Sequence, residues 1–312
     1  MKPFAFVFPG QGSQSVGMLD GWGDHRAVRD TVDEASAALD LDIGSLIRTG
    51  PKEQLDLTTN TQPLMLTAGV ACYRAWLAET HHAPSIVAGH SLGEYSALVV
   101  AGALRLADAL PLVRFRAQAM QEAVPAGTGA MAAVMGLDDE TLAAVCAEAA
   151  QGQVVEPVNF NAPAQIVIAG HREAVERAIA LAKTRGAKRG LLLPVSAPFH
   201  SSLLKPAAER LAAYLANVEL RAPSIPVLHN VGVAAAATPA AIREALSRQA
   251  ASPVRWADTM RAFAADGVTH IVECGPGGVL SGLAKRTVPE VPVHPTNDDD
   301  ALAAALAAIK EA

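Results

Sequence analysis

The chain has 312 residues, 51% of them hydrophobic and 18% charged, with a formal net charge of −6 at pH 7. This size and composition fit a globular enzyme of one large domain or two unequal ones, and the negative charge disfavours a general nucleic-acid surface. No export signal or membrane-spanning run is evident in the sequence, so we expect a cytoplasmic protein. The three cysteines, Cys72, Cys146 and Cys274, lie far apart in apolar runs, which indicates reduced core residues without disulfide or metal-ligand spacing.

The first half of the chain alternates short apolar strands with longer helical patterns. We expect strands at 4–8 and 86–88, and helices at 27–39, 61–77 and directly after Ser91. This alternation is typical of a parallel α/β sheet.

From Ala130 the pattern changes to six elements in the order strand, helix, strand, strand, helix, strand. The expected strands are 131–135, 154–160, 165–169 and 190–195, and the expected helices are 138–150 and 172–185. This order predicts a ferredoxin-like α+β unit.

Turn-forming residues flank this unit, with Pro125-Ala126-Gly127 before it and Ala197-Pro198 after it. We therefore expect a small domain at 128–198, inserted into a catalytic domain made of residues 1–127 and 199–312. Beyond the unit, helical patterns at 206–215 and 240–248 and an apolar strand at 269–273 indicate that the chain returns to the first sheet.

The sequence Gly89-His90-Ser91-Leu92-Gly93 follows an apolar strand and leads into a helical run. In this setting Gly-x-Ser-x-Gly predicts a nucleophile elbow, in which the glycines permit a sharp turn and the serine hydroxyl is exposed at a helix N-terminus. Ser91 is therefore the candidate nucleophile for acyl chemistry. The alternative is that Ser91 and Glu94 form only a helix capping box. In both cases we expect Glu94 in the first helical turn, without a catalytic role.

A serine nucleophile needs a base, and histidine is the usual one near neutral pH. Among nine histidines, His200 lies where the inserted domain returns the chain, and a cleft is expected at such a junction. We expect His90 to support the turn, because adjacent side chains at an elbow point apart. No Asp or Glu between Ser91 and His200 lies in a recognisable acid motif, so a backbone carbonyl could orient the ring instead.

The loop Pro9-Gly10-Gln11-Gly12 directly follows the first predicted strand. It lacks the glycine and lysine spacing of dinucleotide- and phosphate-binding loops. An oxyanion hole suits it better, formed by the backbone N–H groups of Gln11 and of Leu92, the residue after the nucleophile.

The predicted helix at 109–121 carries two arginines, Arg114 and Arg116. Surface arginines on a helix are generally solvated. A buried arginine that faces the nucleophile would instead select a substrate with a free carboxylate, through a bidentate pair.

Seven segments, in order over nearly the whole chain, support a comparison with a known family. They are Phe-Pro-Gly-Gln-Gly-Ser-Gln (8–14), Gly-His-Ser-Leu-Gly-Glu-Tyr-Ser-Ala-Leu (89–98), Arg116 in Arg-Ala-Gln-Ala-Met, Asn-Phe-Asn-Ala-Pro (159–163), Pro-Phe-His-Ser (198–201), Gln249 ahead of Pro-Val-Arg-Trp, and Glu-Cys-Gly-Pro-Gly (273–277). Together they closely resemble the malonyl-CoA:acyl carrier protein transacylases of fatty acid synthesis. The resemblance implies an α/β-hydrolase-like large domain with a parallel sheet and an inserted ferredoxin-like small domain.

The resemblance also implies a role for each candidate residue. It implies Ser91 as nucleophile, His200 as base, the N–H groups of Gln11 and Leu92 as the oxyanion hole, Arg116 as partner of the malonyl carboxylate, and Gln249 as the residue whose backbone carbonyl orients the histidine. Phe199, before the histidine, matches relatives that prefer malonyl over methylmalonyl groups.

The implied reaction is a ping-pong transfer of a malonyl group from malonyl-CoA to the phosphopantetheine thiol of holo acyl carrier protein. It requires no metal and no bound cofactor, and we expect a monomer without nucleic-acid or membrane partners. The carrier protein is acidic in this family, so the basic stretches 183–189 and Lys285-Arg286 are candidate docking ground. The segment 228–232 lacks an acidic residue often found there, and we expect it to be peripheral.

Two other enzyme classes remain open at this point. A discrete malonyl acyltransferase serving a polyketide synthase would use the same residues with another carrier protein. A serine esterase or thioesterase of the same fold is disfavoured by Arg116 and by the missing triad acid. A non-enzymatic scaffold is disfavoured because Ser91, His200, Gln11 and Arg116 occur together.

Overall fold

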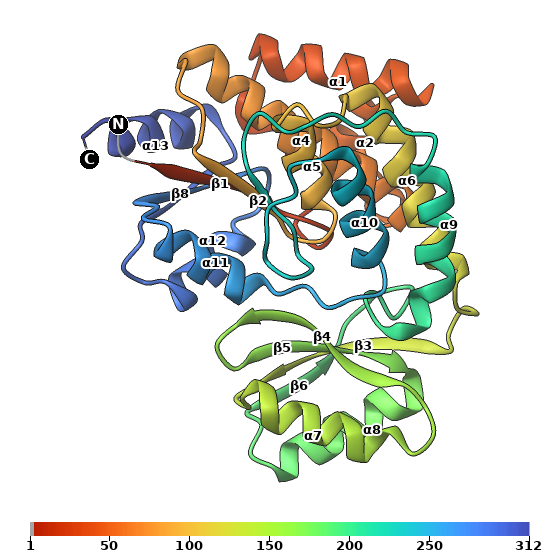
Figure 1. Ribbon diagram of the computed structural model, residues 1–312. Helices are drawn as coiled ribbons and strands as arrows, with labels where there is room; N and C mark the ends of the chain where they lie inside the picture. The colour runs from red at the N-terminus through yellow and green to blue at the C-terminus, as the bar shows by residue number, and fades with distance from the viewer. Residues whose placement is uncertain (1–2, 312) are drawn as a thin grey trace.

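The computed structural model describes residues 3–311 and contains two sheets, one parallel and one antiparallel (Figure 1). Residues 1, 2 and 312, at the ends of the predicted large domain, lie outside the described part. The expected α/β class with a parallel sheet is confirmed. None of the helices within residues 3–311 combines the length and the apolarity of a membrane-spanning segment.

The parallel sheet has five strands in the order β7-β2-β1-β8-β9. The strands are β1 (Phe4–Phe8), β2 (Ile86–Gly89), β7 (Val227–Leu228), β8 (His270–Cys274) and β9 (Val293–Thr296). Every neighbouring pair runs parallel. β1 has the predicted bounds, and β8 begins one residue later than predicted. The carboxyl ends of these strands therefore meet at one edge of the sheet, where open α/β sheets place their ligands.

Alternate residues of β1 pack into two separate apolar clusters. Phe4, Phe6 and Phe8 belong to the cluster on one face, and Ala5 and Val7 to the cluster on the other. The first face is covered by α1 (Arg26–Leu39), α4 (Thr58–Glu79), α5 (Gly93–Val100) and α6 (Leu106–Glu122), and the second by α11 (Trp256–Ala265) and α12 (Val279–Thr287). Because both faces are buried, all five residues of β1 are apolar, as expected for a central parallel strand.

The remaining helices extend these two layers. They are η1 (Asp20–Trp22), α2 (Ile43–Thr49), α3 (Lys52–Leu55), η2 (Ser202–Leu204), α9 (Lys205–Leu215), α10 (Pro239–Gln249) and α13 (Asp299–Glu311). α9 packs between α6 and α10, and α13 packs against β9 (Figure 1).

The antiparallel sheet has four strands in the order β4-β5-β3-β6. Its elements are β3 (Gly129–Met135), α7 (Asp139–Ala150), β4 (Val155–Ala162), β5 (Gln165–His171), α8 (Arg172–Thr184) and β6 (Arg189–Leu192). The predicted sequence of six elements is observed. β6 ends three residues before the predicted Val195, because Pro194 has no N–H group to continue the ladder.

One short pairing joins β4 to the segment before α11. Asn159 bridges to Val254, the N–H of Phe160 donates to the carbonyl of Val254 at 2.9 Å, and the N–H of Val254 donates to the carbonyl of Val158 at 2.8 Å. α7 and α8 cover the opposite, outer face of the four-stranded sheet (Figure 1). The inner face of this sheet is thereby held beside the carboxyl edge of the parallel sheet.

Candidate active site

Ser91 lies between β2 and α5, and its backbone adopts a left-handed conformation with φ of 51°. The flanking glycines are required for close approach. A Cβ on Gly89 would lie 1.8 Å from the carbonyl carbon of Gly93, and one on Gly93 would lie 2.0 Å from the carbonyl oxygen of Phe8. The turn is therefore pressed between its own helix and β1. The alternative capping box is wrong, because the N-cap position is Leu92 and no side chain caps this helix.

His200 contacts the Ser91 hydroxyl directly. Its Nε2 lies 2.7 Å from Ser91 Oγ, and its Nδ1 lies 2.9 Å from the backbone carbonyl oxygen of Gln249. Since a carbonyl only accepts, Nδ1 carries the proton and Nε2 is free to accept one. Burial, and secondarily the nearby Arg116 guanidinium, lower the pKa of His200 to about 3. The imidazole is therefore neutral at physiological pH, which is the form that a general base needs.

Arg116, on α6, is buried and points at the Ser91 hydroxyl, whereas Arg114 on the same helix is exposed. The Nη2 group of Arg116 donates to Ser91 Oγ at 3.0 Å and to Gln249 Oε1 at 2.9 Å, and Nη1 donates to Gln62 Oε1 at 2.8 Å. Burial lowers the pKa of Arg116 from its usual value. A guanidinium held this way can receive a carboxylate that enters beside Ser91.

A cavity of about 130 Å³ lies over Ser91 and His200. Its lining includes Gln11, Gln62, Leu92, Arg116, Met120, Met131, Leu193, Val195 and Phe199. The loop after β1 reaches it by direct packing, since a Cβ on Gly10 would lie 2.6 Å from the carbonyl oxygen of His90. Five of the six predicted site residues thus line one cavity. The sixth, Gln249, contacts three of them, His200, Arg116 and Ser91, from behind.

His90 does not contact the Ser91 hydroxyl. Its Nε2 lies 2.8 Å from Asn161 Oδ1, and its ring packs against that of Trp256 at 5.4 Å between centroids. The side chain therefore fastens the elbow to β4 and α11. Within residues 3–311 no group of three or more His, Cys, Asp or Glu side chains is arranged to hold a metal ion.

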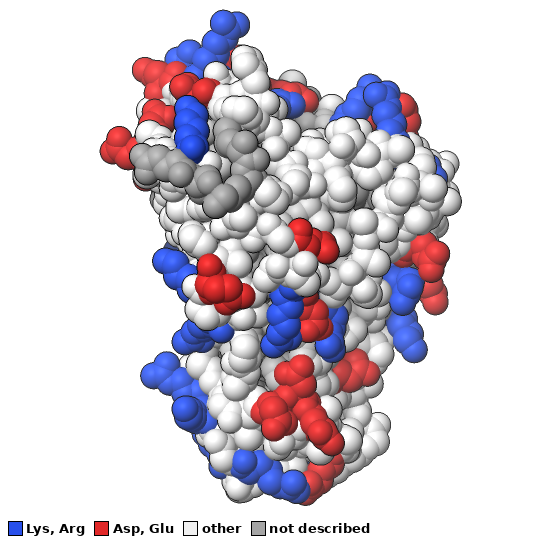
Figure 2. Space-filling view, turned by 60° about the vertical axis from the view of Figure 1, so that its left-hand side comes forward, with Lys and Arg blue, Asp and Glu red and all other residues white. Residues whose placement is uncertain are grey.

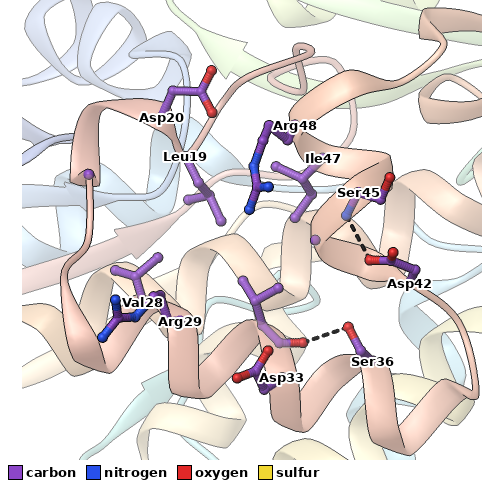
Figure 3. A pocket seen from close by; sticks show the side chains of 13 residues that line it. Leu19, Asp20, Val28, Arg29, Asp33, Ser36, Asp42, Ser45, Ile47 and Arg48 are labelled. Carbon is purple, nitrogen blue, oxygen red and sulfur yellow. Dashed lines mark hydrogen bonds between the residues drawn. The ribbon is translucent and has the colours of Figure 1, made fainter.

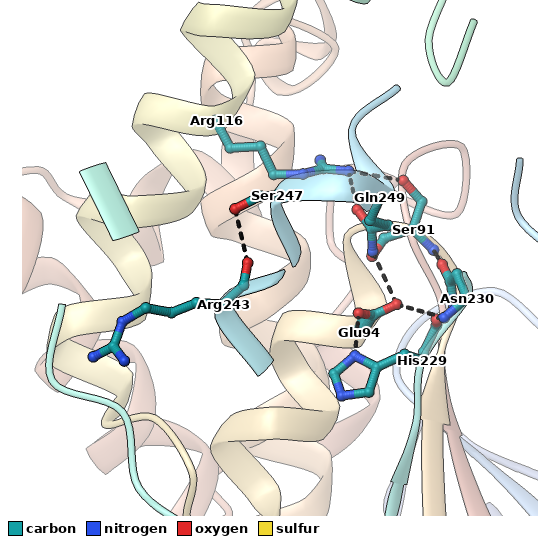
Figure 4. A network of polar contacts seen from close by, with 9 residues as sticks. Ser91, Glu94, Arg116, His229, Asn230, Arg243, Ser247 and Gln249 are labelled. Atoms are coloured by element: carbon teal, nitrogen blue, oxygen red, sulfur yellow. Dashed lines mark hydrogen bonds and ion pairs between the residues drawn. The ribbon is translucent and has the colours of Figure 1, made fainter. Parts of the chain in front are cut away.

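Three buried residues beneath the elbow were not predicted to matter (Figure 4). Asn230 accepts the Ser91 N–H at 2.7 Å through Oδ1 and donates Nδ2 to the carbonyl of Gly89 at 2.7 Å. Glu94 accepts from His229 Nδ1 at 2.6 Å and from the N–H of Asn230 at 2.8 Å. The expectation that 228–232 is peripheral is therefore wrong at His229 and Asn230. The available signal was their position directly after an apolar strand, at the carboxyl edge of the sheet.

Comparisons with known proteins agree over the whole chain. The family model described as "Acyl transferase domain" matches residues 5–308. A malonyl CoA-acyl carrier protein transacylase of Escherichia coli K12 is 55% identical over 98% of this chain and 99% of its own length.

Two solved structures are similarly close. The acyl-carrier-protein S-malonyltransferase of Burkholderia pseudomallei 1710b is 61% identical with a TM-score of 0.97, over 98% of this chain and 99% of that one. A malonyl-transacylase in complex with its type II PKS acyl-carrier protein is 49% identical with a TM-score of 0.96, over the same shares. These findings confirm the resemblance that the seven sequence segments predicted. The chain belongs to the malonyl CoA-acyl carrier protein transacylase family of acyl transferases.

Proposed function

We propose that this chain transfers a malonyl group from malonyl-CoA to the phosphopantetheine thiol of holo acyl carrier protein, in fatty acid biosynthesis. The proposal rests mainly on one observation, that Ser91, His200 and Arg116 line the same cavity. Ser91 Oγ lies 2.7 Å from His200 Nε2 and 3.0 Å from Arg116 Nη2. The 55% identity to a transacylase of that name supports the same substrates.

In the first half-reaction, His200 Nε2 takes the Ser91 proton while Oγ attacks the thioester carbon. The backbone N–H groups of Gln11 and Leu92 receive the oxyanion, and the Gln249 carbonyl stabilises the imidazolium that forms. Collapse of the tetrahedral intermediate breaks the C–S bond and leaves a malonyl ester on Ser91, and the departing coenzyme A sulfur takes the proton from His200. In the second half-reaction the carrier-protein thiol follows the same path and restores the Ser91 hydroxyl. The chain's own residues carry every proton in this scheme, so it includes no bound cofactor.

Arg116 provides the selectivity of this scheme. A malonyl carboxylate would replace Ser91 Oγ as a partner of the guanidinium and would form a bidentate pair with it. The acyl group is then fixed in a cavity of only about 130 Å³, which leaves little room for a hydrolytic water.

The two basic stretches proposed for carrier-protein docking converge in space. Lys188 and Arg189 line one surface groove of about 550 Å³ together with Arg286, which donates a hydrogen bond to Gln165. On the face drawn in Figure 2, basic and acidic side chains are interspersed, which agrees with local docking better than with a general anionic partner. We propose that this groove supplies the charge that an acidic carrier protein needs.

We further propose the domain division 1–127 and 199–312 for the hydrolase-like domain and 128–198 for the ferredoxin-like domain. The strand order β4-β5-β3-β6 with two helices on one face supports the second name, and the five-stranded parallel sheet with its elbow supports the first. A cytoplasmic monomer fits the three free cysteines, all of them buried.

The second candidate is the same malonyl transfer to the carrier protein of a polyketide synthase. The observation that favours it is the 49% identical malonyl-transacylase solved with a type II PKS acyl-carrier protein. Comparison of discharge by carrier proteins of the two classes separates the candidates, since the preferred carrier should accept the malonyl group at the higher kcat/KM.

The decisive experiment is intact-mass measurement after brief incubation with malonyl-CoA. We expect a malonyl adduct on the native chain, none on Ser91→Ala, and discharge of the adduct by holo carrier protein. Release of free malonate without carrier protein would favour an esterase instead. Absence of an adduct on the native chain would refute the proposed chemistry.

A further inference from the structure

Glu94 is a fully buried carboxylate that the proposed mechanism does not use. An ionised carboxylate only accepts hydrogen bonds, and its burial requires several donors. Glu94 Oε1 accepts from His229 Nδ1, and Oε2 accepts from the N–H of Asn230 and from Gln249 Nε2 at 3.1 Å. All three donors belong to segments that reach the elbow from more than 130 residues away in the sequence.

Gln249 is the link between this carboxylate and the active site (Figure 4). Its Nε2 donates to Glu94 Oε2 and to the backbone carbonyl of Ser91 at 2.8 Å, whereas its Oε1 accepts from Arg116 Nη2 at 2.9 Å. A flipped amide would place Oε1 against two acceptors and its NH2 group against a guanidinium. The carboxylate therefore acts together with the Ser91 carbonyl to fix the amide orientation that presents oxygen to Arg116.

The charges along this path are complementary. The positive end of the Gln249 amide dipole faces Glu94, and its negative end faces Arg116. Glu94 also raises the pKa of Arg116, in opposition to the larger lowering by burial. Gln249 is fully buried, so water does not screen the path.

We propose that Glu94 is a positioning residue for selection of carboxylate-bearing acyl groups, acting through the Gln249 amide on the Arg116 guanidinium. This inference rests on the proposed malonyl transfer. The carboxylate holds the amide, the amide holds one branch of the guanidinium, and the guanidinium is thereby aimed at the acyl group on Ser91. Acyl groups without a carboxylate depend less on this path, because they do not bind the guanidinium.

The test is Glu94→Gln, assayed with malonyl-CoA and acetyl-CoA. A glutamine at 94 lacks the negative charge and can turn its NH2 group toward Gln249, so the amide is held more weakly, by the Ser91 carbonyl alone. We expect kcat/KM for malonyl transfer to fall about tenfold and acetyl transfer to fall less. In an Arg116→Ala background, Glu94→Gln should leave the malonyl-to-acetyl ratio unchanged, because the group through which it acts is absent. Equal losses for both substrates, or a further change of ratio in that background, would overturn the inference.

A matched control is Glu273→Gln. Glu273 is also fully buried and accepts the N–H groups of Leu280 and Ser281 at the start of α12, without a contact to Arg116. This variant should lower the melting temperature and keep the native malonyl-to-acetyl ratio. A changed ratio here would assign the effect to general loosening and overturn the inference.

If Glu94→Gln does not fold, Gln249→Met tests the same path from its other end while keeping the backbone carbonyl that contacts His200. The same selective loss of malonyl transfer supports the inference, and a uniform loss refutes it. Failure of the proposed function itself would appear differently, as absence of a malonyl adduct on the native chain.

Discussion

Two cavities of this molecule differ in size and in construction. The larger, about 630 Å³, lies between η1, α1 and α2 (Figure 3), and the smaller, about 130 Å³, lies over Ser91. Charged side chains at the larger cavity, such as Arg29 and Arg48, are exposed. The charged side chain at the smaller cavity, Arg116, is buried and donates hydrogen bonds to Gln62, Ser91 and Gln249. A buried network of hydrogen-bonded polar side chains is therefore a better indicator of an active site in this molecule than the volume of a cavity.

Loss of Arg116 should be the largest departure from native substrate selection. In Arg116→Ala we expect kcat/KM for malonyl transfer to fall about a hundredfold, since a charge-assisted bidentate pair is lost, while acetyl transfer is spared or raised. Parallel assays with the two CoA thioesters measure this difference. Equal losses of malonyl and acetyl transfer would show that Arg116 does not bind the malonyl carboxylate. The buried guanidinium would then no longer distinguish the smaller cavity from the larger one chemically.

The pH dependence of the reaction tests the environment of His200. Because its pKa is lowered to about 3, the ring stays neutral from pH 8 down to pH 5. A histidine with an ordinary pKa would lose about thirtyfold of its base form at pH 5. We therefore expect kcat/KM to be nearly level over this range, and a fall centred near pH 6.5 would contradict the burial argument.

The same shift has a consequence for stability whose sign follows from proton binding. Between its unfolded pKa and about 3, the histidine binds a proton in the unfolded chain but not in the folded one. This group therefore makes folding less favourable as the pH falls through that window. Arg116→Ala removes the second cause of the lowered pKa of His200. In this variant the apparent pKa of His200, measured from the pH dependence of acetyl transfer, should rise but stay below that of an ordinary histidine.

Much of this site was predictable from the sequence because the strongest signals are local. The Ser91 elbow needs two glycines at fixed spacing, and the bounds of β1 follow from its five apolar residues. The contacts of Glu94 with His229 and Asn230 join positions 135 and 136 residues apart, and no local pattern encodes such a meeting. The two-residue β7, which delivers them, is too short to give a periodic signal. The contact of the Gln249 carbonyl with His200 was predicted only through the family resemblance, because a backbone carbonyl leaves no side-chain signature.

Asn230 tests whether the network beneath the elbow supports catalysis. Its side chain fixes both Ser91 and Gly89 in a turn whose serine is left-handed, a conformation that needs support from its surroundings. Asn230→Ala should lower the free energy of unfolding by about 1–3 kcal/mol and reduce kcat for both acyl groups about tenfold. Denaturant unfolding and steady-state assays measure the two effects. A variant with native kcat would show that the elbow holds its geometry without this contact.

Arg48 gives the smallest expected effect and tests the other half of the comparison. It lies on α2 at the larger cavity, is exposed, and is not among the residues that line the cavity over Ser91. Solvent already hydrates its charge, so Arg48→Ala should change the free energy of unfolding by less than about 0.5 kcal/mol and leave malonyl and acetyl transfer at native rates. A loss of transfer in this variant would mean that the larger cavity communicates with Ser91, and the contrast between exposed and buried polar groups would no longer separate the two regions.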